Sequence, residues 1–377
     1  MIRNTTIAAT ALLMTGTAAH AIGLDRSANN IGILFEEGDY AELSFGYVAP
    51  DISGTDVAIF GGQGTGDVAS NYFTGALGYK QQVNDQLSFA IILDQPYGAD
   101  ITYPAFVPGG GGSAALENTS AKLSSSALTV LGRYEFGNGF SLHGGLRAQQ
   151  LSGFVELGGA RFGGPPPGGL SGYSTTVDSD IDFGYAVGAA YEIPEIAMRV
   201  ALTYFSEIDH ELDVVEFGAF PGTTEVTTPQ AVNLDFQTGV AEGTLVFGQI
   251  RWADYGEVSL SPPVFAASTG GASLVGIDSN FRYTLGVGRR FTENFSGAVS
   301  LTYERDEGDS VSPLGPTDGS IGLTVGGSYD MGPVKITGGI NYTKLGDTFV
   351  ETSTGIRTTD FDDNEAIGVG IRIGYRF

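Results

Sequence analysis

The feature that most constrains the fold of this chain is a regular alternation of apolar residues with small or polar ones. From Ile367 to Phe377 every second residue is apolar, and the residues between are glycine or arginine. A period of two places all the apolar side chains on one face of a β-strand. Beyond residue 21 no apolar run approaches the ~18 residues that a membrane-spanning helix needs. The alternation therefore predicts a chain built from strands that each have one apolar face.

The same alternation recurs along the chain, for example from Tyr40 to Val48 and from Phe281 to Val287. The opposite face of these segments carries mostly Gly, Ser, Thr and Ala, whereas the outer face of a soluble β-sandwich would carry many Lys and Glu. Tyr and Phe recur near the ends of the apolar faces, where a membrane barrel has its two aromatic girdles. We therefore predict an all-β, antiparallel transmembrane β-barrel rather than a soluble sandwich or solenoid.

The segments predict a barrel of about fourteen strands over residues 40–377, without a separate domain. The even number places both ends of the barrel on one side. Long and short connections alternate, as the outer loops and periplasmic turns of outer-membrane barrels do. The predicted strands are 40–48, 71–80, 86–94, 121–136, 139–157, 181–193, 196–212, 230–238, 243–255, 279–290, 295–306, 319–330, 333–345 and 364–377.

Residues 1–21 are predicted to form a cleavable signal peptide. Arg3 precedes a short apolar stretch from Ile7 to Met14, and small residues then lead to Ala19-His20-Ala21. The alternative is a membrane anchor, which is disfavoured because the apolar stretch is too short to cross a bilayer. We expect an exported protein whose mature chain begins at Ile22.

Residues 22–39, between the signal peptide and the first strand, are predicted to enter the barrel from the periplasmic end as a short plug. The alternative is a frayed periplasmic tail, which the large apolar residues of this segment make less favourable. The residues assigned to the plug are Leu24, Arg26, Ile31, Leu34 and Phe35.

The chain is strongly acidic, with a formal net charge of −25 at pH 7. A chain of this sign repels the phosphate backbone, which excludes nucleic acid as a partner. The sequence has no cysteine, so disulfides and thiolate metal sites are excluded as well.

Several segments resemble the FadL family of outer-membrane transporters for long-chain fatty acids and hydrocarbons. The best of them is Thr228 to Leu234, TPQAVNL, followed after a turn by Leu245 to Tyr255, LVFGQIRWADY. Asp182 to Glu192 with Arg199 to Tyr204 is similar to the family's paired central strands. The likeness runs in order from about residue 40 to the end of the chain.

The resemblance implies a passive channel for hydrophobic molecules, and it includes one departure from the family. The family's plug is usually longer and contains an Asn-Pro-Ala sequence, which is absent here. We therefore expect a branch with a shortened plug, and the gating that depends on the usual plug is in doubt.

Three inward arginines, Arg147, Arg251 and Arg372, are expected in the middle of the barrel wall. A guanidinium group binds a carboxylate through two parallel hydrogen bonds, as the head group of a fatty acid would require. The alternative is that these arginines pair with inward carboxylates and stabilise the wall.

The predicted outer loops contain apolar clusters that loops facing only water do not need. Such clusters often mark ligand grooves, although loops that fold over a barrel mouth also need a small core, and the same residues can serve both roles. The residues assigned to an outer-loop groove are Phe106, Val107, Phe162, Phe217, Phe220, Val264 and Phe265, and Leu274-Val275 forms a further cluster.

Neither a catalytic site nor a cofactor is expected. His143 faces inward, but its neighbour on that face, Ser141, is a residue type found on nearly every strand. The acidic runs Glu304 to Asp309 and Asp360 to Asp363 could bind calcium through their oxygens, but such runs are more often solvated.

The function predicted from these features is passive uptake of hydrophobic compounds, such as long-chain fatty acids, across a bacterial outer membrane. The molecules would be captured at the outer-loop groove and passed through the barrel by a monomer embedded among lipid and lipopolysaccharide. The alternatives are a general diffusion porin for hydrophilic solutes and a loop-based adhesin or receptor.

Overall fold

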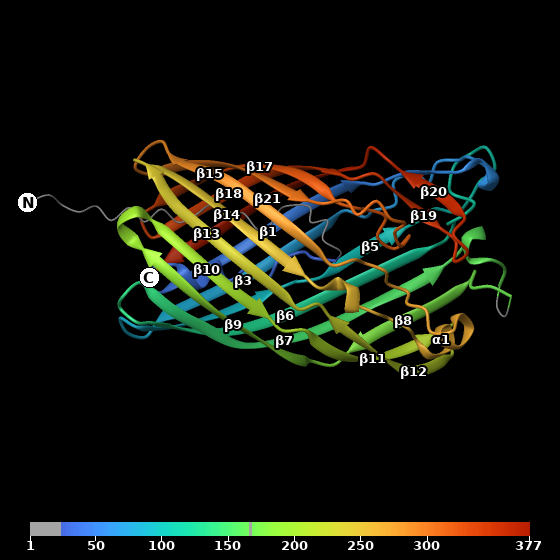
Figure 1. Cartoon of the computed structure of the whole chain (residues 1–377), viewed down its shortest axis with the longest axis horizontal. Coiled ribbons are helices and arrows are strands. Elements are labelled where there is room, and N and C mark those ends of the chain that lie inside the picture. The colour runs from blue at the N-terminus through green and yellow to red at the C-terminus, as the bar shows by residue number, and fades with distance from the viewer. Residues whose placement is uncertain (1–23, 166–167) are drawn as a thin grey trace, which may run out of the picture.

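The computed structural model describes residues 24–165 and 168–377, which form a closed antiparallel β-barrel of fourteen strands (Figure 1). The barrel closes because β1 pairs with both β3 and β21. The predicted signal peptide lies outside the described residues. The barrel strands are β1 (Tyr40–Asp51), β3 (Tyr72–Gln82), β4 (Leu87–Asp94), β6 (Ser120–Glu135), β7 (Phe140–Leu157), β9 (Asp182–Ile193), β10 (Met198–Phe205), β13 (Ala231–Ala241), β14 (Thr244–Ala253), β15 (Asn280–Arg290), β16 (Phe295–Glu304), β17 (Ser320–Met331), β18 (Val334–Leu345) and β21 (Glu365–Arg376).

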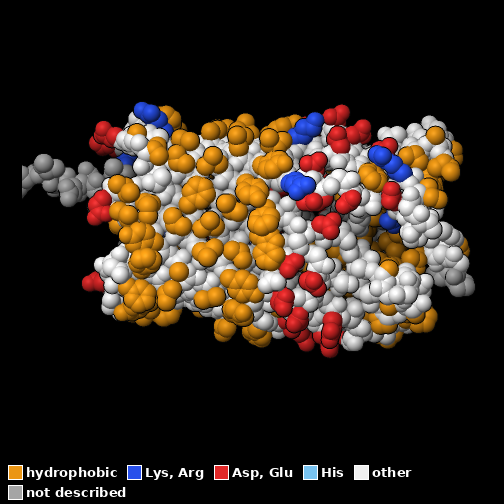
Figure 2. Space-filling view, viewed as in Figure 1, with side chains coloured by type: hydrophobic (Ala, Val, Ile, Leu, Met, Phe, Trp, Pro, Cys, Tyr) orange, Lys and Arg blue, Asp and Glu red, His pale blue; other side chains and the backbone are white. Residues whose placement is uncertain are grey.

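Apolar side chains form a broad band on the face of the barrel shown in Figure 2. Leu285 of β15 and Leu301 of β16 are 58% and 55% exposed. Gly286, which follows Leu285 and faces the lumen, is buried. An exposed apolar area of this extent is stable only when lipid covers it. Acidic side chains gather along the band's edge nearer the long loops (Figure 2). The predicted inward and outward parity of the barrel strands is confirmed.

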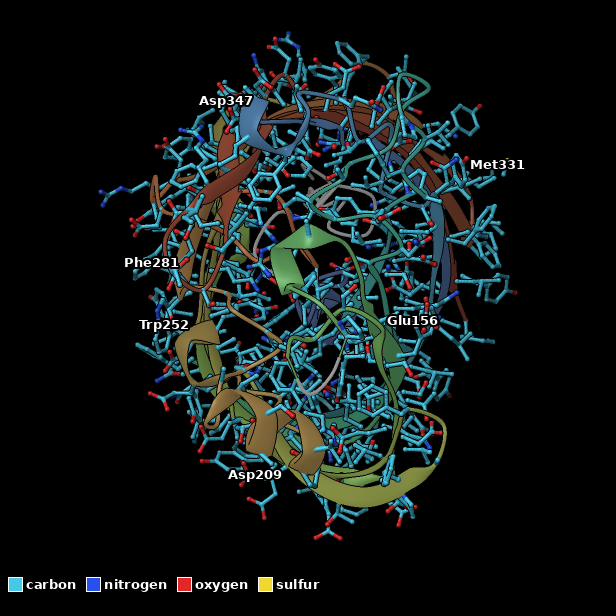
Figure 3. All side chains as sticks on the ribbon, turned by 90° about the vertical axis from the view of Figure 1, so that its right-hand side faces the viewer. Glu156, Asp209, Trp252, Phe281, Met331 and Asp347 are labelled. Carbon is cyan, nitrogen blue, oxygen red and sulfur yellow. The ribbon has the colours of Figure 1, made fainter. Side chains whose placement is uncertain are left out.

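The long-loop end of the molecule continues beyond the band as additional strands and short helices (Figures 1 and 3). Strand β5 extends the sheet beside β6, and β8, β11 and β12 extend it beside β7. A separate sheet of β2, β20 and β19 covers part of the mouth. The extending strands are β5 (Gly98–Thr102), β8 (Tyr173–Ser179), β11 (Ile208–Glu216) and β12 (Phe220–Thr228), and the covering sheet is β2 (Gly54–Asp56), β19 (Thr348–Glu351) and β20 (Arg357–Phe361). The helices are η1 (Gly32–Phe35), η2 (Ala58–Phe60), η3 (Ala160–Phe162), η4 (Pro194–Ile196), η5 (Tyr255–Glu257) and α1 (Pro263–Thr269).

The predicted strand 196–212 is wrong in one respect, because the chain breaks at Ser206 into β10 and β11. The backbone N–H of Ser206 donates to Tyr185 O at 2.9 Å, and the Ser206 hydroxyl accepts from Tyr185 N at 2.9 Å. Odd-numbered residues are buried in β10 and even-numbered residues in β11, so the parity shifts by one across the break. Beyond the break, β11 pairs with β8 and β12 instead of β9 and β13.

Residues 24–39, called here the plug segment, lie inside the barrel. Ile31, Ile33 and Leu34 of this segment are buried in the main apolar core, which continues into the outer loops. Among the described residues, no helix is long and apolar enough to cross a membrane.

Candidate functional site

The plug segment runs along the lumen from the long-loop side to the short-turn end. Near the outer loops, Gly98 N donates to Leu24 O at 2.9 Å and Arg26 N donates to Pro96 O at 2.8 Å. At the other end, Phe377 N donates to Asp39 O at 3.1 Å. The segment therefore spans the region through which any molecule in the lumen must pass.

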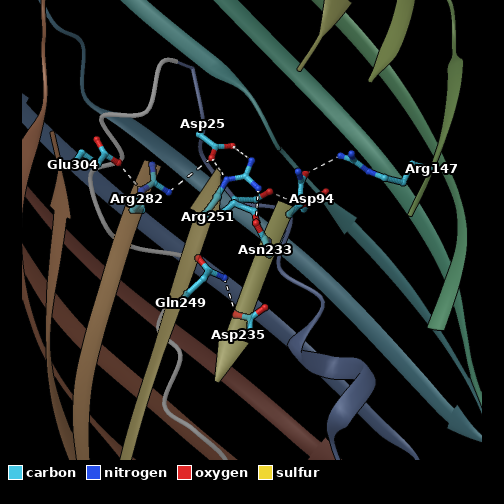
Figure 4. A network of polar contacts seen from close by, with 12 residues as sticks. Asp25, Asp94, Arg147, Asn233, Asp235, Gln249, Arg251, Arg282 and Glu304 are labelled. Atoms are coloured by element: carbon cyan, nitrogen blue, oxygen red, sulfur yellow. Dashed lines mark hydrogen bonds and ion pairs between the residues drawn. The ribbon is translucent and has the colours of Figure 1, made fainter. Parts of the chain in front are cut away.

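A carboxylate of the plug segment, Asp25, binds two arginines of the wall (Figure 4). Arg251 Nε and Nη2 donate to the two Asp25 oxygens at 2.6 and 3.1 Å, and Arg282 Nη1 lies 3.8 Å from Asp25 Oδ2. Arg282 Nε donates to Glu304 at 2.6 Å. All four side chains are at most 3% exposed.

Strand register brings these wall residues together. Asn233, Arg251, Arg282 and Glu304 lie directly opposite one another on the neighbouring strands β13, β14, β15 and β16. Two like charges directly opposite each other destabilise a strand pair. The negative charge of Asp25 offsets the repulsion between Arg251 and Arg282, so the plug segment stabilises this part of the barrel wall.

Hydrogen bonds from amide side chains extend the network along the plug segment. Arg251 Nη1 donates to Asn233 Oδ1 at 2.9 Å, and Asn233 Nδ2 donates to Ala28 O at 2.9 Å. Arg147 Nη2 donates to Asn29 Oδ1 at 2.8 Å, and Ser27 Oγ donates to Asp94 Oδ2 at 2.5 Å. The plug segment is therefore held by polar contacts on opposite sides of the lumen.

The three arginines predicted to bind a carboxylate are not gathered at one place. Arg147 and Arg251 are engaged by the plug segment, and Arg372 lies 3.8 Å from Glu42 and donates to Ser44 Oγ at 3.3 Å. Their role in binding a fatty-acid head group stays a prediction. Among the described residues, the Nη1 and Nη2 atoms of Arg282 and the hydroxyl of Tyr255 are buried and have no hydrogen-bond partner.

At the short-turn end the lumen opens into a vestibule of ≈870 Å³. Its inner end is Phe35, whose ring lies between the guanidinium groups of Arg133 and Arg199, at 4.7 and 4.5 Å from the ring centre. His143 meets the same ring edge-on at 5.8 Å. Arginine stacked on an aromatic face is favourable, so these contacts fix the lower part of the plug segment.

His143 and Ser141 do not form a catalytic pair. His143 Nε2 is hydrogen-bonded to Thr203 Oγ1 at 2.9 Å, and Ser141 Oγ accepts from Arg133 Nε at 3.1 Å. Each side chain thus has a different structural partner.

An apolar pocket of ≈170 Å³, called here the outer pocket, opens among the outer loops. Figure 2 shows a hollow lined by apolar side chains on this part of the surface. The loop between β14 and β15 forms one side, the loop between β16 and β17 another, and Leu24 of the plug segment also contributes. The apolar residues that line it are Leu24, Ala99, Ala121, Leu123, Phe154, Val155, Val177, Leu260, Val275, Ile277, Val311 and Leu314.

The seven residues predicted for an outer-loop groove are not among those lining the outer pocket. Phe217 and Phe265 instead pack on Tyr173, with ring centres 5.3 and 5.2 Å apart. Beside them, Glu216 is 1% exposed and accepts hydrogen bonds from Val264 N at 2.7 Å and Phe265 N at 2.8 Å. These residues thus form a core within the loops.

Tyr173 belongs to the same loop core, where its hydroxyl donates to Glu216 Oε1 at 2.8 Å. Burial and the adjacent Glu216 carboxylate raise the pKa of Tyr173. Tyr173 therefore stays protonated as a hydrogen-bond donor.

The remaining predicted groove residues are dispersed. Phe220 and Val107 are exposed, and Phe106 lies next to Val107. Phe162 packs against the main apolar core and against a second cluster of buried residues that includes Tyr103 and Leu116. Their role in binding a ligand stays a prediction. The Leu274-Val275 cluster does supply a lining residue, Val275.

A second apolar pocket, called here the wall pocket, lies where the barrel wall is incomplete. Strands β3 and β4 pair up to Leu77 and Leu93, and the next backbone hydrogen bond beyond them runs from Ser70 N to Asp100 O at 3.0 Å. Between these points the chain from Gln95 to Gly98 binds the plug segment instead of β3.

The wall pocket has a volume of ≈70 Å³ and is bordered by residues of both barrel faces. Phe45, Leu77 and Ile371 belong to the lipid-facing set, and Ser27 and Asp94 belong to the lumen. The pocket therefore lies between the lumen beside the plug segment and the outer apolar band.

Comparison with protein families identifies the chain. Residues 1–287 match the model of the family described as outer membrane protein transport protein (OMPP1/FadL/TodX). The chain belongs to this family. This bacterial outer-membrane family comprises transport proteins for hydrophobic compounds. A comparison with curated proteins gives no match.

Solved structures with the same fold include three members of the FadL and TodX group. A Pseudomonas aeruginosa FadL homologue is 15% identical, with a TM-score of 0.69 and 96% of each chain covered. The Pseudomonas putida toluene transporter TodX is 13% identical, with a TM-score of 0.64 and 96% and 97% of the two chains covered. The Ralstonia pickettii toluene transporter TbuX is 14% identical, with a TM-score of 0.61 and the same coverage. At these identities the likeness shows a shared fold.

The acidic runs considered for calcium bring no metal site together. Within residues 24–165 and 168–377, no group of three or more His, Asp or Glu side chains could hold a metal ion. One of these acids, Glu304, is instead buried against Arg282 and Ser320.

Sequence reasoning missed Asp25, Arg282 and the residues of the outer pocket other than Val275 and Leu24. The signal for Asp25 was a carboxylate between Leu24 and Arg26 in the short segment that precedes the first strand. Leu260 and Leu314 are flanked by Ser, Pro or Gly, and no local pattern distinguishes them, whereas Ile277 follows the Leu274-Val275 cluster.

Proposed function

We propose that this FadL-type chain takes up hydrophobic compounds, including hydrocarbons and long-chain fatty acids, by passive passage through the barrel. The observation that carries the proposal is the position of plug residues 24–27. Leu24 lines the outer pocket, whereas Arg26 and Ser27 line the wall pocket. Only Asp25 therefore separates the plug residue that lines the outer pocket from those that line the wall pocket.

The proposed path begins in the outer pocket, where Leu260, Val275 and Ile277 remove an apolar molecule from water. The molecule then moves along the plug segment past Asp25 and Tyr97 and leaves between β3 and β4. It enters the membrane at Leu77 and Phe45, which are 52% and 53% exposed. An apolar exit of this kind avoids transfer into the aqueous periplasm.

Uptake of a radiolabelled alkane or of oleate by cells that express the chain tests this proposal. Leu260→Trp should fill the outer pocket and reduce uptake several-fold, because the lining is close-packed on its other sides. Ile356→Trp is the matched control, since Ile356 is an exposed loop residue that does not line the outer pocket. Deletion of the gene should slow growth on the same compound.

Liposome swelling separates this function from a general porin. Sugar flux through the reconstituted chain, together with unchanged alkane and oleate uptake in the deletion strain, would replace the proposal with a hydrophilic diffusion pore. Unchanged growth and uptake without sugar flux would favour an adhesin or receptor.

A further inference from the structure

The outer pocket is apolar inside and acidic at its rim. Its charged lining residues are Lys122, Asp278, Glu307 and Asp318, one cation against three carboxylates. Asp278 and Glu307 are exposed, so a molecule that enters from the cell surface passes close to their negative charges. The pocket also lies beyond the edge of the apolar band where other acidic side chains gather (Figure 2).

The single cation of the rim is already compensated. Lys122 Nζ lies 3.2 Å from Asp100 Oδ2, directly across the β5–β6 pair. Asp318 is held in place by hydrogen bonds from Glu307 N and Gly308 N at 3.0 and 2.8 Å. No rearrangement of the rim is needed to keep its net charge negative.

Three arginines of the lumen already have carboxylate partners within the protein. Asp25 and Glu304 already bind Arg251 and Arg282, and Glu42 lies near Arg372. An incoming carboxylate would therefore compete with carboxylates of the protein for the same guanidinium groups.

We propose that the rim of the outer pocket is a charge filter, which admits uncharged apolar molecules and repels carboxylates. This inference rests on the proposed capture role of the pocket and deepens it, since it assigns neutral hydrocarbons rather than ionised fatty acids as the preferred cargo. The size of the pocket agrees with this assignment. A cavity of about 150 Å³ with an aliphatic and aromatic lining binds benzene in an engineered protein, and the outer pocket measures ≈170 Å³.

Two probes of the same size but different charge test the filter. Binding of 4-fluorotoluene and 4-fluorobenzoate to the full chain in nanodiscs is followed by fluorine NMR at low ionic strength. The Leu260→Trp variant gives the background from partition into lipid. The wild-type chain should bind the toluene, and its affinity for the benzoate should be much weaker but rise with added salt, because salt screens the repulsion.

The double variant Asp278→Asn/Glu307→Gln removes two rim charges. Its affinity for 4-fluorobenzoate should increase by about fivefold per carboxylate, as expected for a unit charge ~4 Å away in water, while 4-fluorotoluene binding stays unchanged. The matched control is Asp209→Asn/Glu211→Gln, which neutralises two exposed carboxylates of β11 that do not line the pocket.

Equal affinities of the wild-type chain for the two probes would overturn the charge filter, as would a double variant with unchanged benzoate binding. In both of those cases the capture role would stand. If neither probe binds above the Leu260→Trp background, the proposed function itself fails.

Discussion

Asp25 of the plug segment forms two hydrogen bonds with Arg251 of β14, at 2.6 and 3.1 Å, and both side chains are fully buried. The carboxylate also lies 3.8 Å from Arg282, which is directly opposite Arg251 in the sheet. A buried charge that loses its partner is costly, whereas replacing a whole buried pair by apolar residues is often neutral. The position of the plug segment therefore depends on this carboxylate.

Asp25→Asn should loosen the plug segment without unfolding the barrel. Loss of the negative charge leaves the buried Arg251 without its carboxylate partner, at a cost of ~3 to 5 kcal/mol, while Arg282 retains Glu304. We expect faster trypsin cleavage after Arg26 in the reconstituted protein, because the neighbouring peptide bond becomes accessible. Glu37→Gln is the matched control, since Glu37 has a side chain that is 63% exposed and lies 3.9 Å from Arg376.

The double variant Asp25→Leu/Arg251→Leu distinguishes electrostatics from packing. It should restore much of the resistance to trypsin that Asp25→Leu alone loses, because the buried charge is removed together with its partner. Equal cleavage of the wild-type chain, Asp25→Asn and Glu37→Gln would show that other contacts hold the plug segment.

Much of the barrel could be predicted from sequence because lipid and lumen impose a strict period of two on every strand. The break at Ser206 could not be, since the apolar residues stay at even positions on both sides of it. Val200 and Leu202 before the break face outward, whereas Leu212 and Val214 after it are buried, so the buried face shifts by one residue without a change in the sequence pattern. Only the pairing of Ser206 with Tyr185 reveals the shift. Glu207 shares the odd parity of the buried residues in β10, but it is exposed because it lies beyond the break.

The candidate site was less predictable because it depends on contacts between distant segments. The inward position of Arg251 followed from strand parity, but its partner Asp25 is 226 residues away in the chain. Similarly, Leu260 and Leu314 belong to different loops, and they line one pocket only after the barrel has closed. Apolar clusters that are adjacent in sequence, such as Val264-Phe265, instead formed the core of their own loop.

Gly75→Phe tests the exit between β3 and β4. A Cβ atom added at Gly75 meets no heavy atom nearer than Ser44 O at 3.9 Å, so the backbone tolerates a side chain there. A phenyl group on this lipid-facing position should cover the wall pocket and slow hydrocarbon uptake several-fold, while probe affinity at the outer pocket stays unchanged.

The matched control for this exit is Val299→Phe on β16, which adds the same group to the lipid face away from the wall pocket. If both variants take up hydrocarbon at the wild-type rate, the molecules leave by another route. A loss of probe affinity in Gly75→Phe would show that the two pockets are not independent.

Glu216→Gln should release the loop that carries α1. The buried carboxylate accepts hydrogen bonds from Val264 N, Phe265 N and the Tyr173 hydroxyl, whereas an amide has one acceptor oxygen. Each unmet buried partner costs about 1 to 3 kcal/mol. Hydrogen exchange of the peptide containing residues 263–269 should accelerate, while Glu211→Gln, an exposed change on the same strand, should leave it unaltered. Unchanged exchange in Glu216→Gln would mean that aromatic packing alone holds the loop.

The apolar band predicts that the cost of a charge depends on its depth in the membrane. Leu285 lies midway along the lipid-facing side of β15, and Phe281 lies near its outer end on the same face. Leu285→Arg should lower the free energy of unfolding by ~2 to 4 kcal/mol. For Phe281→Arg the charge itself should lower it by at most ~1 kcal/mol, in addition to the effect of removing the phenyl ring, because a side chain near the interface reaches water. Chemical unfolding of both variants in lipid vesicles measures the difference. The alanine variants at both positions provide the control for lost side-chain contacts. Equal costs of arginine at the two depths would place β15 differently in the bilayer and would move the boundary of the band.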